Sequence, residues 1–269
     1  MSKQGLADPL GSAQPRDYRN YVSDAQLATE YAAYQARYAD NPKECDKRTA
    51  QLVLQSLQST QPSGSRPRIL DIGCSTGNFL RLTKQLLPNA ELVGGDLMKP
   101  VIEQCRRDPS LQGIAFEVMD VFDIPSAPPF DVIVANAVSV YFEPDEYRRA
   151  LASVGRALRP GGSFIAYEWI CPGAEQRRIT EQSAWHPNGL TFWFRSETFL
   201  RDALSEAGFS QSSVEWFELP IDLPKPIPGS RAEATLETYT IKEQGSGRRM
   251  MFRGVLHQPW AHIVARKSS

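Results

Sequence analysis

The segment ILDIGCSTGNFL, residues 69–80, constrains what this chain can fold into more than any other. Its apolar beginning predicts a buried strand, and the residues after Gly77 predict the first turn of a helix. Between them, Gly73 and Gly77 allow a tight turn in which the backbone approaches a ligand, because a side chain at either position would occupy that space. The segment therefore predicts a strand–turn–helix unit with a ligand site at the turn.

Further apolar segments follow at the spacing of alternating strands and helices. Strands are predicted at 90–98, 114–120, 130–137 and 163–170, and helices between them at about 77–87, 98–108 and 144–158. This alternation implies a parallel sheet with helices on both faces, and such sheets bind ligands outside the carboxyl ends of their strands. The polar residues that end these strands are therefore predicted to lie together: Asp71, Asp96, Asp120 and Asn136.

Asp71, near the end of the first strand, affects which ligand the turn accepts. A dinucleotide would place its pyrophosphate over this turn, where a carboxylate would repel it. A ligand with a positive charge and a ribose would be attracted instead, and S-adenosylmethionine has both. Asp96, at the end of the second strand, is placed to accept hydrogen bonds from the two ribose hydroxyls.

This ordered set of residues resembles the class I S-adenosylmethionine-dependent methyltransferases. The resemblance covers about residues 65–210 and is looser over the closing strands. It rests on the turn at 71–77, Asp96, Asp120-Val121, Asn136 and the run Arg159-Pro160-Gly161-Gly162. The chain departs from the family at Ser75, which stands where the family's turn has its middle glycine.

The resemblance implies a doubly wound, seven-stranded, mostly parallel Rossmann-like sheet and S-adenosyl-L-methionine as cofactor. It also implies that Asp96 binds the ribose, that Asp120 binds the adenine amino group, and that Val121 and Phe122 pack against the adenine ring. The glycine turn would contact the methionyl part. The residues predicted to bind the cofactor are Asp71, Gly73, Ser75, Gly77, Asp96, Leu97, Asp120, Val121, Phe122 and Asn136.

Composition excludes several classes of partner. The 30 basic and 31 acidic side chains give a formal charge of −1, so no basic field favours nucleic acid. No apolar run is long enough for a membrane-spanning helix, and the polar first twenty residues lack the core of a signal peptide. The four cysteines are widely spaced and the three histidines form no helical pair, which predicts a reduced cytoplasmic protein without a metal.

The chain is predicted to have three parts: a disordered tail at 1–15, a helical cap at 16–62, and a methyltransferase domain at 63–269. The domain carries insertions at 171–194, expected to be a loop, and at 220–258, expected to hold a β-hairpin at 236–253. The last strand, at 261–267, is expected to run antiparallel beside 163–170. The cap's tyrosines, Tyr34 among them, either form a lid over the site or pack on the domain. The oligomeric state stays open.

Methyl transfer from a sulfonium is an in-line displacement that an aromatic, dry pocket assists. The residues predicted to form the substrate wall are Tyr34, Tyr141, Trp169, Trp185, Trp193 and Phe194. His186 is either a base or a hydrogen-bonding loop residue. Glu168 is a base, an anchor for a substrate amine, or one half of a salt bridge.

Several functions compete with this interpretation. Asp71 disfavours a nicotinamide dehydrogenase, and NAVSVYF at 136–142 replaces the proline-containing motif of a DNA amino-methyltransferase. A protein methyltransferase and a non-catalytic cofactor-binding subunit stay open. The sequence favours a methyltransferase for a small molecule, at oxygen first, with nitrogen and carbon as alternatives.

Overall fold

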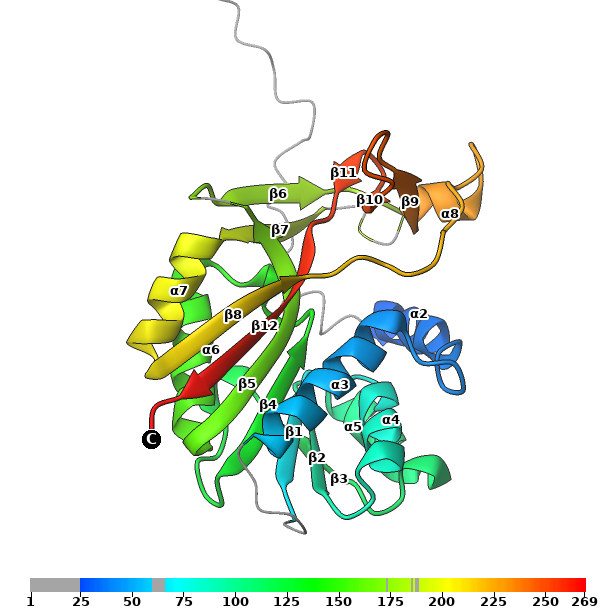
Figure 1. Ribbon diagram of the computed structural model, residues 1–269. Helices are drawn as coiled ribbons and strands as arrows, with labels where there is room; N and C mark the ends of the chain where they lie inside the picture. Colours follow the sequence, from blue (N-terminus) through cyan, green and yellow to red (C-terminus); the bar gives the residue numbers. More distant parts are fainter. Residues whose placement is uncertain (1–24, 60–65, 173, 185, 187–188) are drawn as a thin grey trace, which may run out of the picture.

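The computed structural model describes residues 25–59, 66–172, 174–184, 186 and 189–269. A twisted sheet lies between two layers of helices, and a smaller sheet lies beyond one end of it (Figure 1). The predicted tail at 1–15, the start of the predicted cap, and Trp185 lie outside the described residues.

The central sheet contains the strands that the sequence predicted. They are β1 (Arg68–Ile72), β2 (Glu91–Asp96), β3 (Ala115–Val118), β4 (Phe130–Asn136), β5 (Leu158–Cys171), β8 (Phe209–Trp216) and β12 (Trp260–Lys267). Their order is β3-β2-β1-β4-β5-β12-β8. β1 to β5 are parallel, and β12 is antiparallel to both β5 and β8. The predicted fold class, a doubly wound and mostly parallel α/β sheet, is confirmed.

Helices cover both faces of the sheet (Figure 1). One face carries α3 (Glu44–Gln58), α4 (Asn78–Leu86) and α5 (Lys99–Arg107), and the other carries α6 (Pro144–Ala157) and α7 (Glu197–Glu206). Local sequence sets their starts. Pro144 occupies the first turn of α6, where its missing N–H is harmless. The Ser196 hydroxyl accepts a hydrogen bond from the Phe199 N–H and caps α7.

Four further elements precede or connect these strands and helices. α2 (Ala25–Ala36) precedes α3 and lies beside its start in Figure 1. Three single-turn 3₁₀ helices follow α5, β3 and β4: η1 (Pro109–Leu111), η2 (Val121–Asp123) and η3 (Ser139–Tyr141). η2 and η3 are therefore carried directly by the strand ends, where the sequence placed the ligand site.

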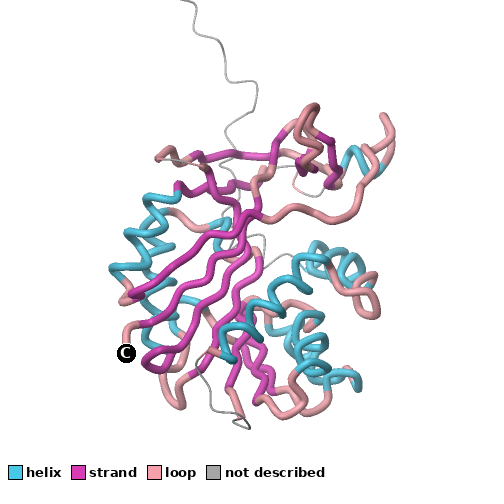
Figure 2. The backbone as a smooth tube through the Cα atoms, viewed as in Figure 1, coloured by secondary structure: helices cyan, strands magenta, loops and turns pink. Residues whose placement is uncertain are grey.

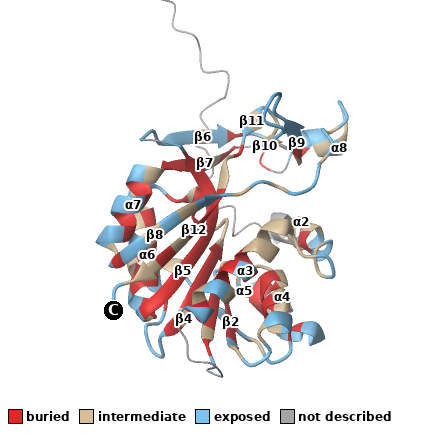
Figure 3. Ribbon diagram, in the orientation of Figure 1, coloured by how far each residue is buried: buried red, intermediate tan, exposed pale blue. Residues whose placement is uncertain are grey.

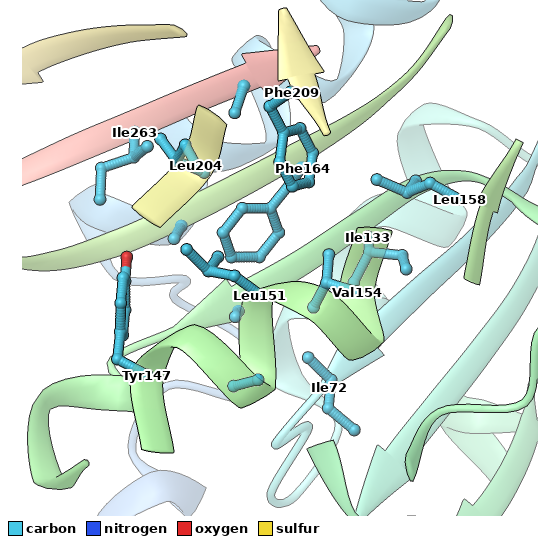
Figure 4. Close-up of a cluster of buried hydrophobic side chains, with 14 of the residues drawn as sticks. Ile72, Ile133, Tyr147, Leu151, Val154, Leu158, Phe164, Leu204, Phe209 and Ile263 are labelled. Atoms are coloured by element: carbon cyan, nitrogen blue, oxygen red, sulfur yellow. The ribbon is translucent and has the colours of Figure 1, made fainter. Parts of the chain in front are cut away.

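Two apolar layers hold the helices to the sheet. Leu151 and Val154 of α6 and Leu204 of α7 pack on Phe164 of β5, and Figure 4 shows their side chains together. The opposite layer joins α3, α4 and α5 to β1 and β4. Figure 3 shows that β5, which lies between these layers, is buried along most of its length. Burial on both faces is why the parallel strands read as continuous apolar runs.

The insertion at 171–194 was predicted to be a loop, and this prediction is wrong. It contains β6 (Arg177–Glu181) and β7 (Leu190–Ser196), which pair antiparallel. The end of β7 also pairs parallel with the end of β5, so the sheet has nine strands rather than seven. The reason is alternation: Phe192 and Phe194 are buried, while Thr191 and Trp193 are less so.

A second sheet lies beyond the carboxyl ends of the central strands (Figure 2). It contains β9 (Thr238–Lys242), β10 (Arg249–Arg253) and β11 (Leu256–His257), and follows the short α8 (Arg231–Ala234). β9 and β10 pair antiparallel within the segment predicted as a hairpin. The boundaries of the three predicted parts stay predictions. In the described ranges, no helix has the length and apolar character to cross a membrane.

Candidate active site

The turn after β1 is fixed to the end of β2 by backbone hydrogen bonds. The N–H groups of Gly73 and Cys74 donate to the Gly95 carbonyl at 2.7 and 3.0 Å. Gly73 has a φ of +75°, and a Cβ there would collide with the Val138 side chain. Ser75, at the position of the family's middle glycine, also has a positive φ of +47°. Its N–H donates to the Asp96 carboxylate at 3.0 Å, which holds this left-handed residue in place.

A cavity of about 220 Å³ opens above this turn. We call it the first cavity. It is lined by Gly73, Ser75 and Thr76 after β1, Asp96–Met98 after β2, Met119–Phe122 after β3, and Asn136–Val138 after β4. The lining also includes Tyr31 and Ala32 of α2, Ile72 of β1, Val101 of α5, Tyr141 of η3 and Phe142 after it. The strand ends therefore meet at one site, as the alternation of strands and helices predicted.

Two carboxylates in this cavity are held by the backbone around them. Asp96 accepts hydrogen bonds from the N–H groups of Ser75 and Met98, the latter at 2.9 Å. Asp120 caps η2 by accepting from the Phe122 N–H at 3.0 Å. Burial raises the pKa of Asp96, and the two hydrogen bonds oppose that rise. Both side chains are thus oriented before any ligand binds.

A second cavity, of about 390 Å³, adjoins the first. The two share Tyr31, Gly73, Ser75, Thr76, Asn136 and Ala137. The rest of the second cavity is lined by α2, the start of α3 with the residues before it, the start of α4 and the segment after β8. Cys74 and single residues of β1, β5, β9, β10 and β12 also line it. Its aromatic side chains include Tyr34, Tyr38, Tyr167, Phe217 and Trp260. The second cavity is therefore an aromatic chamber that meets the first at the glycine turn.

Asp71 and Asp46 add two desolvated acidic side chains to this chamber. Asp71 is 3% exposed, and no described residue forms a hydrogen bond or ion pair with its carboxylate. Burial, followed by the charges of Asp46 and Asp96, raises the pKa of Asp71 well above its usual value. Burial also raises the pKa of Asp46 to about 6, against the lowering effect of Lys43. A cationic ligand would relieve this concentration of desolvated acid.

Asn136 connects the junction of the two cavities to α3. Its Nδ2 donates to the Asp46 carboxylate at 3.3 Å, and its Oδ1 lies 3.2 Å from the Thr49 hydroxyl. The same hydroxyl lies 3.1 Å from Nε2 of His262, which is fully buried on β12. Burial lowers the pKa of His262 to about 4, so this histidine is neutral at physiological pH. This series of polar contacts from Asp46 to His262 holds the Asn136 amide in one orientation at the junction.

Comparison with known proteins assigns this arrangement to a family. Residues 69–162, which run from β1 into β5 and supply most of the first cavity, match the family described as a methyltransferase domain. This segment is therefore a methyltransferase domain, and S-adenosylmethionine is the cofactor that its likeness supports. The resemblance seen in the sequence is thereby confirmed.

Individual relatives of this methyltransferase differ in their named substrates. Trans-aconitate 2-methyltransferase from Methylobacterium nodulans is 32% identical over 120 residues, which cover 45% of this chain and 44% of the relative. A probable tRNA methyltransferase 9B from Mus musculus is 31% identical over 137 residues, covering 50% and 28%. The chain thus spans less than half the length of these curated relatives.

A solved structure agrees over almost the whole chain. It is the Burkholderia thailandensis 1,6-didemethyltoxoflavin-N1-methyltransferase with bound 1,6-didemethyltoxoflavin and S-adenosylhomocysteine. The two superpose with a TM-score of 0.59 and 16% identity, covering 95% of this chain and 92% of that one. At this identity the likeness establishes the fold of the methyltransferase and leaves its acceptor open.

Most residues predicted to bind the cofactor lie around the first cavity. Those that line it are Gly73, Ser75, Asp96, Leu97, Asp120, Val121, Phe122 and Asn136. Asp71 lines the second cavity instead. Gly77 lines neither, because it forms the N-terminal cap of α4 with a φ of +75°. The roles of these residues toward the cofactor stay proposals.

Glu168 lies away from both cavities. It is fully buried with Arg195, whose Nη1 lies 3.5 Å from its carboxylate, and it also accepts a hydrogen bond from the Ser139 hydroxyl. Arg195 in turn donates to the carbonyls of Ser139 and Phe142 and lies 3.9 Å from the Tyr147 ring centre. Of the roles considered for Glu168, this position favours the salt bridge.

Of the described residues predicted to form the substrate wall, two line a cavity and three do not. Tyr34 lines the second cavity and Tyr141 the first. Trp169 and Phe194 are buried in a cluster behind Trp260, with the Trp169 ring centre 5.1 Å from that of Trp260. Trp193 lies on β7 and lines neither cavity, nor does His186, which is buried near Ser183.

Several cavity residues were not singled out from the sequence. Asp46 looks like an ordinary helix-start acid, since it lies in the first turn of α3. Tyr167 and Trp260 come together only through the pairing of β5 with β12, where their rings stack at 4.3 Å. Their positions in the sequence could have indicated them: Tyr167 lies one residue before Glu168, and Trp260 is the first residue of the last strand.

Proposed function

We propose that this methyltransferase transfers the methyl group of S-adenosylmethionine to a small organic acceptor bound in the second cavity. The observation that carries the proposal is the junction of two unlike cavities at Gly73, Ser75 and Asn136. The first cavity presents the carboxylates of Asp96 and Asp120 after β2 and β3, and the second cavity adds an aromatic wall beside Asp46 and Asp71. A methyl group held at the junction would face both.

The residues of the first cavity suit the cofactor's charges and its ribose. The cofactor supplies a methyl group activated on a sulfonium. Asp96 is oriented to accept two ribose hydroxyls, and Asp120 is positioned to accept the adenine amino group beside Val121 and Phe122. From the adjoining second cavity, the desolvated Asp71 side chain attracts the positive methionyl end. A Cβ at Gly73 would collide with Val138, which lines this cavity.

The second cavity supports a small acceptor rather than a macromolecule. Its volume of about 390 Å³ falls within the range of small-molecule pockets. The names of the relatives do not select an acceptor, since they range from an organic acid to tRNA. Aromatic walls exclude water and align a flat acceptor, which lowers the barrier to in-line displacement.

Binding of S-adenosylhomocysteine, measured by isothermal titration calorimetry, tests the proposal. We expect micromolar affinity in the wild type and at least about a hundredfold weaker binding in Asp96→Ala, because two charge-assisted hydrogen bonds are lost. Asp123→Ala is the matched control, since Asp123 is exposed on η2 and lines neither cavity. It should bind like the wild type.

Two results would change the conclusion. If the folded wild type does not bind S-adenosylhomocysteine, the first cavity is not a cofactor site. If the wild type binds it but methylates no small acceptor, the alternatives gain support: a protein substrate or a non-catalytic cofactor-binding subunit. Transfer of a labelled methyl group from S-adenosylmethionine distinguishes these cases.

A further inference from the structure

Asp46 is a carboxylate of the second cavity that lies beside the junction with the first. It lies in the first turn of α3, lines the second cavity, and accepts a hydrogen bond from Nδ2 of Asn136 at 3.3 Å. Asn136 lines both cavities. Asp46 is therefore one hydrogen bond away from the side chain that both ligands would share.

We propose that Asp46 is the proton acceptor for a planar aromatic alcohol bound in the second cavity. This inference rests on the proposed function, because it assigns the class of acceptor and the base to the same site. Neither base considered from the sequence, His186 or Glu168, lines either cavity. Asp46 supplies the missing group from a helix that precedes the cofactor turn.

The walls of the chamber select a flat ring. The Tyr167 and Trp260 rings stack at 4.3 Å with an interplanar angle of 6°, and the Phe217 ring meets Tyr167 edge-on at 5.4 Å. Tyr34 and Tyr38 face the same cavity from the cap side. Aromatic surfaces arranged in this way favour stacked or edge-to-face contact with a planar ligand.

The titratable and polar groups around Asp46 come from several elements. Lys43 and Cys45 lie beside it on the chain, with the Cys45 Sγ 4.0 Å from its carboxylate. Asp71 of β1 faces it, as do Tyr167 of β5 and Asn136 of β4. Lys43 itself lies 4.6 Å from the Tyr38 ring centre. Since burial outweighs Lys43, the pKa of Asp46 rises to about 6, which makes this carboxylate a stronger base than an exposed aspartate.

The proposed step balances without a further reactant. The acceptor's O–H bond breaks and its proton passes to the Asp46 carboxylate. The oxygen lone pair forms a bond to the methyl carbon, and the carbon–sulfur bond breaks with its electron pair left on sulfur. The proton on Asp46 then passes to solvent, so the enzyme returns to its starting state.

Binding of three matched probes tests the inference in the presence of saturating S-adenosylhomocysteine. 2-Naphthol carries the ring and the hydroxyl, 2-methoxynaphthalene lacks the donor, and 2-naphthoate carries a negative charge. We expect 2-naphthol to bind most tightly to the wild type. The carboxylates of Asp46 and Asp71 should repel 2-naphthoate, and 2-methoxynaphthalene offers Asp46 no hydrogen.

Variants then assign the preference to Asp46. Asp46→Asn should weaken 2-naphthol about tenfold or more, the effect of one hydrogen bond to a charged group, and leave 2-methoxynaphthalene unchanged. Asp46→Glu should restore part of the loss. Asp40→Asn is the matched control, because Asp40 is exposed just before α3 and lines neither cavity.

The outcomes separate this inference from the proposed function. If the wild type binds S-adenosylhomocysteine but not 2-naphthol, or prefers 2-naphthoate, the inference is wrong and the cofactor site stands. If Asp46→Asn weakens all three probes equally, Asp46 is merely structural. If S-adenosylhomocysteine itself does not bind, the proposed function fails first.

The rate of methyl transfer to 2-naphthol gives a second readout. Because Asp46 must be ionised to accept a proton, kcat/KM should rise with pH through about 6 and then level off. Asp46→Asn should lower kcat at least about tenfold and remove this limb of the profile. An unchanged profile in Asp46→Asn would overturn the assignment.

Discussion

Two groups of desolvated acid in this protein differ in what surrounds them. Glu168 is fully buried with Arg195 at 3.5 Å, and neither side chain lines a cavity. Asp46, Asp71 and Asp96 lie around the two cavities, and none forms an ion pair with a described residue. Burial raises the pKa in both groups.

The difference separates an acid paired with a cation inside the fold from cavity acids that form no ion pair among the described residues. The Glu168–Arg195 pair joins β5 and β7 to η3, because Arg195 also donates to the carbonyls of Ser139 and Phe142. The cavity acids have no such cation, so their desolvation is compensated only when a positive ligand enters. Burial alone therefore does not distinguish a functional carboxylate from a structural one, whereas the presence or absence of a paired cation and of an adjoining cavity does.

Breaking the buried pair gives the largest expected effect. Glu168→Gln leaves the Arg195 charge buried without its counterion, so the free energy of unfolding should fall by about 3–5 kcal/mol. Urea denaturation followed by circular dichroism measures this change. S-Adenosylhomocysteine affinity of the remaining folded protein should stay near the wild-type value.

The matched control is an exposed ion pair. Arg148 and Glu206 lie 3.0 Å apart with side chains 39% and 58% exposed. Glu206→Gln should therefore cost less than about 1 kcal/mol. If both variants lose the same free energy of unfolding, the buried Glu168–Arg195 pair contributes no more to stability than an exposed ion pair does.

The pH dependence of stability gives a smaller effect of defined sign. The pKa of Asp46 is about 6 in the folded protein against an ordinary value of 3.8, so the folded state binds the proton more tightly. Asp46 therefore stabilises the protein at low pH and loses that contribution as pH rises through about 6. The wild type should gain on the order of 1 kcal/mol relative to Asp46→Asn between pH 7 and pH 4.

Urea denaturation of both proteins at intervals across this range tests the prediction. The comparison with Asp46→Asn isolates one group, because His262 acts in the opposite sense. Its pKa is lowered to about 4, so its contribution is lost as pH falls below its ordinary 6.5. A constant difference between the two proteins would show that Asp46 is solvated.

The sequence predicted the sheet and most of the first cavity, because both depend on local patterns. The apolar run of β4 and the acids at the ends of β1, β2 and β3 are properties of short segments. Parallel topology then brings those ends together without further information. Asp96, Asp120 and Asn136 were therefore found correctly as neighbours at one edge.

The acceptor side was poorly predicted, because it is assembled by long-range pairing. β5 alternates Tyr167, Glu168 and Trp169, and the sequence could not show that only Tyr167 reaches a cavity. The pairing with β12 decides this, since Trp260 lies between Trp169 and the cavity. Asp46 was missed because a helix-start acid is ordinarily explained by the helix dipole.

Asp71→Asn tests the central claim most directly, because it changes one cavity acid at constant shape. At pH 8 the unliganded variant should be more stable than the wild type by about 1 kcal/mol, since a desolvated charge is removed. Its affinity for S-adenosylhomocysteine should fall at least about tenfold. A loss of stability like that of Glu168→Gln, or unchanged affinity, would show that Asp71 serves the fold rather than a cationic ligand.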